Sequence, residues 1–528
     1  MKQVHEHAFS MSGCGCCRSS RRSFLSQCAT CAAGGFGLSM LASHVHAAEG
    51  SDKPRIRVTF SHTTPETITW PNIGYDYEGH KAQFLKQLAE ACPGFELLPV
   101  WIRDAETAKQ VMADDQQVDG YVVDMVGMGG GGSTLVTMLG KAQRPTVLVD
   151  NLYAGGANFL VSNTQAHKAG CKVVGLATSR FADIADVVRC LAILKQPGKS
   201  VDDFFAAAEA VRMKNIAKAG DMSCAKDDVK LNDVGECLKR LKETKILVVG
   251  TNGMSSDAIV RGIADVFGTE TVRIDFPVLD EAYRKADPDE AAELADRWIA
   301  QAEKVIEPKR EEIIKSGAMH LAMSTLMKQH GASAVAVHCL GGFYGGHLTA
   351  YPCLGFAQLN NDGLLGACEA DLMSTITMLA LGYLAERPGF ISDPVIDTAK
   401  NQIIYAHCVA SSKVFGPGGA TNPHHIRTHS EDRQGAAIRS LMPLGYMTTT
   451  IKFDPLRREC VFHQGKTVEN VDLDQACRTK LAAEVVGDID KLLNGWSYGW
   501  HRVTFYGELK EPVKDLCNAL GMKVVEEA

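Results

Sequence analysis

The sequence predicts an α/β protein, with two doubly wound α/β lobes followed by a β-rich α+β C-terminal domain. Short apolar stretches alternate with helical patterns from residue 55 to about residue 330, which is typical of parallel sheets covered by helices. After residue 334 the runs become shorter and alternate in hydrophobicity, which indicates a barrel or a sandwich. A chain of 528 residues is also too long for one hydrophobic core.

The composition is that of a globular protein, with 45% hydrophobic and 22% charged residues. The net charge is −7, and no long basic run occurs outside the N-terminus. Nucleic acid and anionic membrane surfaces are therefore not expected as partners. No segment after the N-terminus has 18 uninterrupted apolar residues, so no transmembrane segment is expected.

Residues 1–48 have the features of a signal peptide. Ser20 to Leu25 (Ser-Arg-Arg-Ser-Phe-Leu) looks like a twin-arginine signal, a mildly apolar region follows, and cleavage is expected near Ala47 or Ala48. An unrelated basic N-terminus is the alternative. The signal predicts the twin-arginine export machinery as a partner and a periplasmic location. Because that machinery moves folded proteins, it suits a protein whose cofactor is inserted before export.

Five of the seventeen cysteines lie in this signal, so twelve remain in the mature chain. Cys28 and Cys31 would ordinarily suggest redox or metal chemistry, but they are expected to be removed with the signal. In an oxidising periplasm some of the twelve could pair. Cys224 with Cys237 is the expected pair, because both lie in a polar, loop-like segment.

An N-terminal α/β domain is predicted over residues 55–165. Strands are expected at 55–60, 95–100, 119–125 and 146–149, and helices at 80–92 and 105–113. The run Gly127 to Gly132 follows a buried strand and could cradle a phosphate through backbone N–H groups. It lacks the Gly-Lys-Ser/Thr ending of a P-loop. A turn that lets a substrate or a neighbouring subunit approach is therefore favoured.

A second α/β domain is predicted over residues 168–330. Strands are expected at 172–176, 245–250 and 272–275, with helices at 202–215, before 243, and in one long charged run from about 289 to 316. Two consecutive lobes of this kind resemble a periplasmic sugar-binding protein, which is a competing interpretation.

The third domain, residues 334–528, holds eight of the seventeen histidines. It opens with an apolar strand at 334–338 and continues in short alternating runs at 445–453, 459–463 and 501–506. Between them, the apolar spacing predicts an amphipathic helix over 371–384 with Asp371 as its N-cap. A short strand at 390–392 is expected to follow and to end at Pro394.

Two acids flank this helix and strand. Glu369 comes just before the helix, and Asp393 comes just after the strand. If the residues before Glu369 are also extended, a right-handed crossover brings both carboxylates to one edge of a sheet. Two carboxylates in one pocket suit a divalent metal, acid/base chemistry, or both. A solvated acid and an ordinary Asp-Pro turn are the alternative.

The chain resembles the L-fucose/L-arabinose isomerase superfamily. The resemblance is strongest from Cys353 to Gly363, through Cys368-Glu369-Ala-Asp371, to Asp393, and it covers roughly residues 245–520. The N-terminal third matches mainly in architecture. Ala370 and Leu372 depart from the usual residues beside the glutamate, and the C-terminal region looks shorter than in L-fucose isomerases.

The resemblance implies a metal site and an activity. In L-fucose isomerases the motif glutamate and the aspartate after the helix are metal ligands and the proposed catalytic pair, which match Glu369 and Asp393. The third ligand there is a C-terminal histidine, which matches His501. Mixed oxygen and nitrogen ligands suit Mn²⁺, with Mg²⁺, Co²⁺ or Zn²⁺ as alternatives. The implied activity is metal-dependent aldose–ketose isomerisation of a pentose or 6-deoxyhexose-like sugar through an enediolate.

Further residues are candidates for sugar binding. His429, beside Glu431, could bind hydroxyls, Trp500 could offer an aromatic platform, and Gln358 could donate to a hydroxyl; core packing or an ordinary turn explains the last two equally well. His407 could support the metal ligands or serve the fold. Relatives form trimers or hexamers in which a neighbour's N-terminal lobe closes the site, so a homo-oligomer is implied. A non-catalytic periplasmic carbohydrate-binding protein, and a metal-dependent lyase or epimerase, are the alternative functions.

Overall fold

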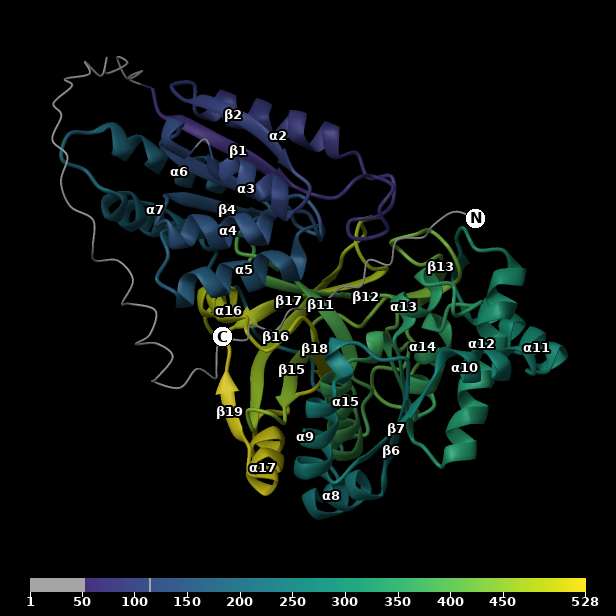
Figure 1. Cartoon of the computed structure of the whole chain (residues 1–528). Helices are drawn as coiled ribbons and strands as arrows, with labels where there is room; N and C mark the ends of the chain where they lie inside the picture. Colours follow the sequence, from purple (N-terminus) through teal and green to yellow (C-terminus); the bar gives the residue numbers. More distant parts are fainter. Residues whose placement is uncertain (1–52, 114) are drawn as a thin grey trace, which may run out of the picture. The chain divides into compact units, whose positions relative to one another are not determined.

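A five-stranded parallel sheet begins the described part of the chain, which comprises residues 53–113 and 115–528 of the computed structural model (Figure 1). The strand order is β2-β1-β3-β4-β5, with β1 (Arg55–Ser61), β2 (Glu96–Ile102), β3 (Gly120–Met125), β4 (Thr146–Asp150) and β5 (Val173–Leu176). Its helices are α2 (Tyr77–Ala91), α3 (Ala105–Ala113), α4 (Gly132–Lys141), α5 (Gly156–Lys168), α6 (Phe181–Arg189) and α7 (Val201–Asn215). Val122 and Val123 of β3 enter different core clusters, because helices or other elements cover both faces of the sheet. The expected parallel α/β organisation is confirmed here.

A second, four-stranded parallel sheet has the order β10-β9-β6-β7. Its strands are β6 (Lys245–Val249), β7 (Glu270–Ile274), β9 (Ala334–Val337) and β10 (Leu365–Ala367). The helices of this region are α8 (Val234–Glu243), α9 (Asp257–Phe267), α10 (Phe276–Arg284), α11 (Pro288–Gln301), α12 (Arg310–His330), α13 (Cys339–Tyr344) and α14 (Cys353–Asn361). The sheets do not follow the expected domain limits: β5 lies beyond residue 165 yet pairs with β4, and β9 lies beyond residue 330 yet pairs with β6. The limits themselves stay a prediction.

The single long helix expected over 289–316 is wrong. Helix α11 ends at Gln301, and α12 begins only at Arg310. Between them lie a two-residue strand, β8 (Lys304–Val305), and Pro308. A proline disfavours helical geometry in the residue before it, so the charged pattern is interrupted although its spacing continues.

The C-terminal part contains a closed barrel of six antiparallel strands, which confirms the expected β-rich region. The ring runs β15-β18-β11-β12-β17-β16 and closes between β16 and β15, while β19 adds to β16. Its strands are β11 (Phe390–Asp397), β12 (Gln402–His407), β15 (Met447–Asp454), β16 (Glu459–Asn470), β17 (Thr479–Val486), β18 (Arg502–Tyr506) and β19 (Lys523–Glu526). A small sheet of β14 (Ala437–Ser440), β13 (His424–Arg427) and β8 lies outside this ring. The helices are α15 (Leu372–Ala385), α16 (Ile489–Gly495) and α17 (Lys510–Leu520).

Helix α15 links the second sheet to the barrel and is buried along nearly its whole length. The expected N-cap is confirmed, because the Asp371 carboxylate accepts a hydrogen bond from the Ser374 N–H at 3.0 Å. The expected end of the next strand at Pro394 is wrong, since β11 continues to Asp397. Strand β18 pairs with β11 only as far as Ser392, so the proline lies where one edge of β11 has no ladder partner and a missing N–H is tolerated.

The described cysteines are all free thiols. Cys224 and Cys237 are not paired: Cys224 Sγ donates to the carbonyl of Met222, and Cys237 Sγ donates to the carbonyl of Ala380. The twin-arginine signal lies outside the described residues. Within them, no helix combines the length and the apolar character that crossing a bilayer requires.

Candidate metal centre

Four side chains converge at one end of the barrel: Glu369, Asp393, His407 and His501. One ligand atom from each lies within 4.8 Å of all the others. His501 Nε2 is 3.6 Å from Glu369 Oε2 and 3.5 Å from Asp393 Oδ1, and His407 Nε2 is 3.8 Å from Glu369 Oε1. The three ligands implied by the family resemblance therefore lie together, with a second histidine beside them.

Strand register explains how three of the four side chains meet. β11 lies between β12 and β18 in the barrel. Asp393 pairs with Ala406, the neighbour of His407, and Ser392 pairs with Arg502, the neighbour of His501. Two antiparallel pairings thus place the three side chains next to one another, although Asp393 and His501 are more than 100 residues apart in the sequence.

Glu369 reaches the centre from a different sheet, and the expected crossover geometry is wrong in this respect. The strand before Glu369 is β10, which pairs with β9 in the second sheet, whereas β11 belongs to the barrel. Glu369 and Asp393 converge because α15 packs between the two sheets, with contacts to β9, β10 and β15. The two carboxylates meet at the junction of two sheets rather than at one edge.

The backbone at Glu369 is held in a conformation that non-glycine residues seldom adopt. Glu369 has a φ of 58° and Ala370 a φ of 49°. Each such residue costs on the order of 1–3 kcal/mol, and it persists only when its surroundings fix it. Asn252 supplies part of this support, because its side-chain Nδ2 donates to the Glu369 carbonyl at 2.6 Å. The strained turn directs the Glu369 carboxylate toward the histidines.

His501 is oriented by the residue that also caps α15. Its Nδ1 lies 3.0 Å from Asp371 Oδ2, and the same oxygen accepts from Lys452 Nζ at 2.9 Å. A carboxylate only accepts, so His501 Nδ1 carries the proton and Nε2 presents a lone pair to the centre when the ring is neutral. Burial would lower the pKa of His501, but the charges of Asp393, Glu369 and Asp371 outweigh it and raise the pKa to about 9.

Burial raises the pKa of both carboxyls at the centre, partly opposed by the positive charge of His501. For Asp371, burial would also raise the pKa, but the Lys452 ammonium and His501 hold it well below its usual range. Asp371 therefore remains ionised, whereas Glu369 and Asp393 crowd their negative charges together. A divalent cation would relieve that repulsion and hold both carboxylates ionised.

The donor set fits a divalent metal ion. Two carboxylates and a histidine Nε2 are hard or intermediate ligands of the kind that Mn²⁺, Co²⁺ and Zn²⁺ accept. His501 Nε2 is buried and has no hydrogen-bond partner among the described residues. The contact from Asp371 to its other nitrogen is the support that metal-binding histidines ordinarily have. Glu369, Asp393 and His501 could therefore hold the ion.

A second polar group borders the centre. The Glu431 carboxylate accepts from the Tyr344 hydroxyl at 3.0 Å, and His429 Nδ1 lies 3.2 Å from Asp432 Oδ1. Burial raises the pKa of Glu431 to about 7. Burial would lower the pKa of His429, but Asp432, Cys408 and Glu431 raise it to about 9. His429 is thus a buried histidine paired with Asp432, beside the buried carboxyl of Glu431.

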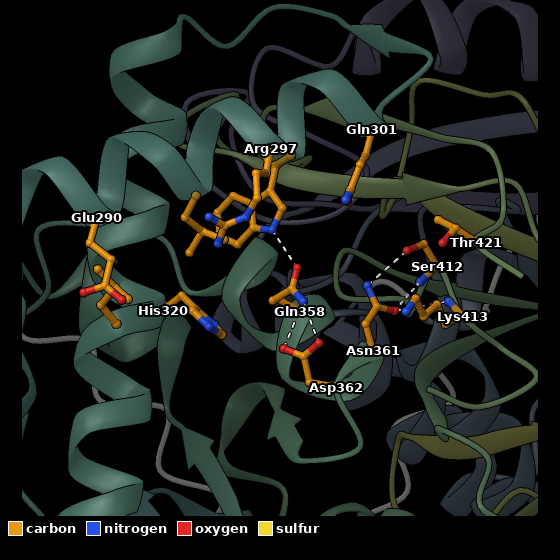
Figure 2. Close-up of a pocket in the computed structure, with 13 residues that line it drawn as sticks. Glu290, Arg297, Gln301, His320, Gln358, Asn361, Asp362, Ser412, Lys413 and Thr421 are labelled. Carbon is orange, nitrogen blue, oxygen red and sulfur yellow. Dashed lines mark hydrogen bonds between the residues drawn. The ribbon is translucent and has the colours of Figure 1, made fainter. Parts of the chain in front are cut away.

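The other sugar-binding candidates lie in different settings. Trp500, next to His501 in sequence, is partly buried against the main core cluster. Gln358 accepts from the Trp298 indole and donates to Asp362, and it lines a cavity of about 320 Å³ with Arg297 and Lys413. Figure 2 shows Gln358 directed toward Asp362 in that cavity. None of the four residues of the centre lines it.

Two residues of the site are not apparent from local sequence pattern. The predicted role of Asp371 is only the cap of α15, and Lys452 is not among the predicted site residues. Both depend on long-range contacts: Lys452 lies on β15, 81 residues from Asp371. The lysine is a charged residue at a buried strand position, which was a signal that it needs an acidic partner.

The chain is similar to several curated proteins that share one name. Proteins named sulfoquinovose isomerase from Priestia aryabhattai and Priestia megaterium are each 26% identical to this chain over 312 residues, covering 55% of it and 66% of the relative. One from Clostridium sp. (strain MSTE9) is 25% identical over 315 residues, with the same coverage. The chain thus spans slightly under two thirds of the length of these curated relatives.

No protein-family model matches the chain. Among solved structures, a regulatory protein of the LacI family from Chloroflexus aggregans aligns with 63% of this chain and 92% of its own, at 11% identity and a TM-score of 0.15. That overlap supports no inference. The similarity to proteins named sulfoquinovose isomerase covers 55% of this chain.

Proposed function

We propose that this chain is a metal-dependent aldose–ketose isomerase that acts on a pentose or a 6-deoxyhexose-like sugar through an enediolate. The observation that carries the proposal is the convergence of Glu369, Asp393 and His501. The relatives' printed names support a sugar as the substrate and make sulfoquinovose itself a sugar to test.

The reaction moves one proton from C2 of the aldose to C1, and one from the oxygen on C2 to the oxygen on C1. A cation held by Glu369, Asp393 and His501, with Mn²⁺ the preferred ion, would supply Lewis-acid stabilisation of the negative charge on those two oxygens. The carboxylates are the chain's proton carriers, and a positioned carrier of this kind typically contributes about 10²–10⁴-fold. Burial of the site, where Asp393 and both histidines are almost inaccessible, keeps bulk water from the enediolate.

The test is product analysis by NMR in D₂O with purified protein, Mn²⁺ and a panel of aldoses that includes sulfoquinovose. We expect a ketose product, and no product from Glu369→Gln. Glu293→Gln is the matched control, because the same change at an exposed position of α11 should leave turnover within about threefold, the ordinary variation among neutral variants.

Other outcomes decide between the alternatives. Sugar binding without metal that survives Glu369→Gln would favour the carbohydrate-binding protein. An aldose epimer, or a shorter product, would favour the epimerase or the lyase. The similarity to isomerases and the metal-type cluster speak against the binding protein.

We also propose that the chain is exported to the periplasm by the twin-arginine machinery and acts there as a homo-oligomer, a trimer or a hexamer. The Arg21-Arg22 pair supports the export route. Replacing both arginines by lysine should retain the protein in the cytoplasm, which cell fractionation measures. Light scattering of the mature protein tests the oligomer.

A further inference from the structure

We infer that His407 presents an N–H group to the centre and acts as a hydrogen-bond donor to an oxygen of the substrate, rather than as a fourth metal ligand. The inference rests on the proposed function for the identity of the acceptor. His407 lies close enough to Glu369, Asp393 and His501 to be counted with them as a ligand. Distance alone does not separate a ligand from a donor, but the hydrogen bond on the other ring nitrogen does.

The backbone N–H of Cys408 donates to Nδ1 of His407 at 3.0 Å. An imidazole nitrogen that accepts a hydrogen bond keeps its lone pair there, so the ring proton resides on Nε2. Nε2 could offer a lone pair to a cation only if this backbone hydrogen bond were lost. Position 407 is the last residue of β12, where the chain turns away from the barrel, and that turn points the Cys408 N–H back at the ring.

His501 shows the opposite arrangement at the same centre. Its Nδ1 faces the acceptor-only carboxylate of Asp371, so its proton is on Nδ1 and its lone pair is on Nε2. The two ring centroids are 5.6 Å apart. Each ring faces the centre with its Nε2, which carries a proton in His407 and a lone pair in His501. The fold supplies one imidazole as a ligand and the other as a donor.

The His407 N–H has no acceptor among the described residues. Nε2 is buried without a partner, and the nearest carboxylate oxygen, Oε1 of Glu369, is 3.8 Å away, beyond hydrogen-bonding distance. A buried donor without a partner costs about 1–3 kcal/mol, so an acceptor is expected in the working complex. A substrate oxygen beside Glu369 would meet that need, and a donor preorganised toward an oxygen that gains negative charge favours enediolate formation.

The first test reads the tautomers directly. Protein labelled with ¹⁵N-histidine is studied by two-bond nitrogen–proton correlation NMR without metal, and His407 is assigned from the signal that disappears in His407→Gln. We expect the His407 proton on Nε2. A His407 ring protonated on Nδ1 would overturn the inference, whatever the protein's activity.

The second test compares His407→Leu, which has no donor, with His407→Gln, whose side-chain N–H can replace it, and with His501→Leu. We expect calorimetric Mn²⁺ affinity within tenfold of wild type for both His407 variants and lost binding for His501→Leu. His407→Leu should lower kcat by about 10²–10³-fold, the usual effect of removing one such donor. The kcat of His407→Gln should be at least about tenfold higher than that of His407→Leu.

A loss of Mn²⁺ affinity of tenfold or more in both His407 variants would make His407 a ligand and refute the donor role. So would a kcat in His407→Leu within tenfold of wild type. If wild-type protein binds Mn²⁺ but isomerises no aldose in the panel, the proposed function fails, while the NMR and affinity measurements still decide whether His407 is donor or ligand.

Discussion

Replacing Asp371 by Asn tests how the centre is built. One oxygen of Asp371, Oδ2, accepts from Ser374 Oγ at 2.7 Å, from Lys452 Nζ at 2.9 Å and from His501 Nδ1 at 3.0 Å. The other, Oδ1, accepts from the Ser374 backbone N–H. Asparagine can retain the cap through its carbonyl oxygen, but its NH₂ group then faces three donors. The substitution therefore removes the charge and the acceptor while keeping the shape.

The substitution should lower both the free energy of unfolding and the affinity for the metal. Lys452 is 3% exposed, so its ammonium loses the buried carboxylate with which it pairs, and breaking such a pair costs about 3–5 kcal/mol of unfolding free energy. His501 also loses the carboxylate that fixes its tautomer. Loss of a supporting contact of this kind weakens metal binding by about 10–100-fold.

The assay separates the two effects with a second variant. Urea unfolding without metal gives the stability, and calorimetry gives the Mn²⁺ affinity. Lys452→Met removes the buried cation, so the double variant with Asp371→Asn should regain most of the lost stability but keep the weakened metal binding. Wild-type Mn²⁺ affinity in folded Asp371→Asn would refute the orienting role of Asp371.

Three further predictions concern charge and thiols. Glu527→Gln leaves the buried Arg502 without its carboxylate and should lower the free energy of unfolding, measured with urea at pH 7, by about 3–5 kcal/mol. Burial would raise the pKa of Glu527, but Arg502 and His463 lower it to about 2. The difference in stability from wild type should therefore persist above pH 4.5 and fade as the pH drops toward 2. Mn²⁺ affinity should rise by more than tenfold between pH 6 and pH 9 in calorimetry, because the raised pKa of His501, about 9, makes protons compete with the metal; a flat profile contradicts this. Cys339 and Cys368, with sulfurs 3.1 Å apart, should form a disulfide when an added small-molecule disulfide takes up their two electrons, and peptide mass spectrometry should find that link.

The fold was predictable wherever it depends on local pattern. Alternating apolar runs located β1, β3 and β4, and apolar spacing located α15 together with its Asp371 cap. The prediction of one long helix in place of α11 and α12 is wrong because the break between them does not alter the local pattern. Charge spacing continues across the break, and only the conformational restriction before Pro308 and the pairing of β8 with β13 interrupt it.

In the candidate site, too, some features follow from the sequence and others only from the tertiary structure. The sequence by itself determined which groups are available: two acids around a predicted helix, and a histidine in a C-terminal strand that a family resemblance marks as a ligand. The tertiary structure alone decided that β11 lies between β12 and β18, which brings His407 and His501 to Asp393, and that Lys452 meets Asp371. The physical reason is that helix caps and hydrophobic periods are set by neighbours in sequence, whereas strand register and the proton position on each histidine are set by partners far along the chain.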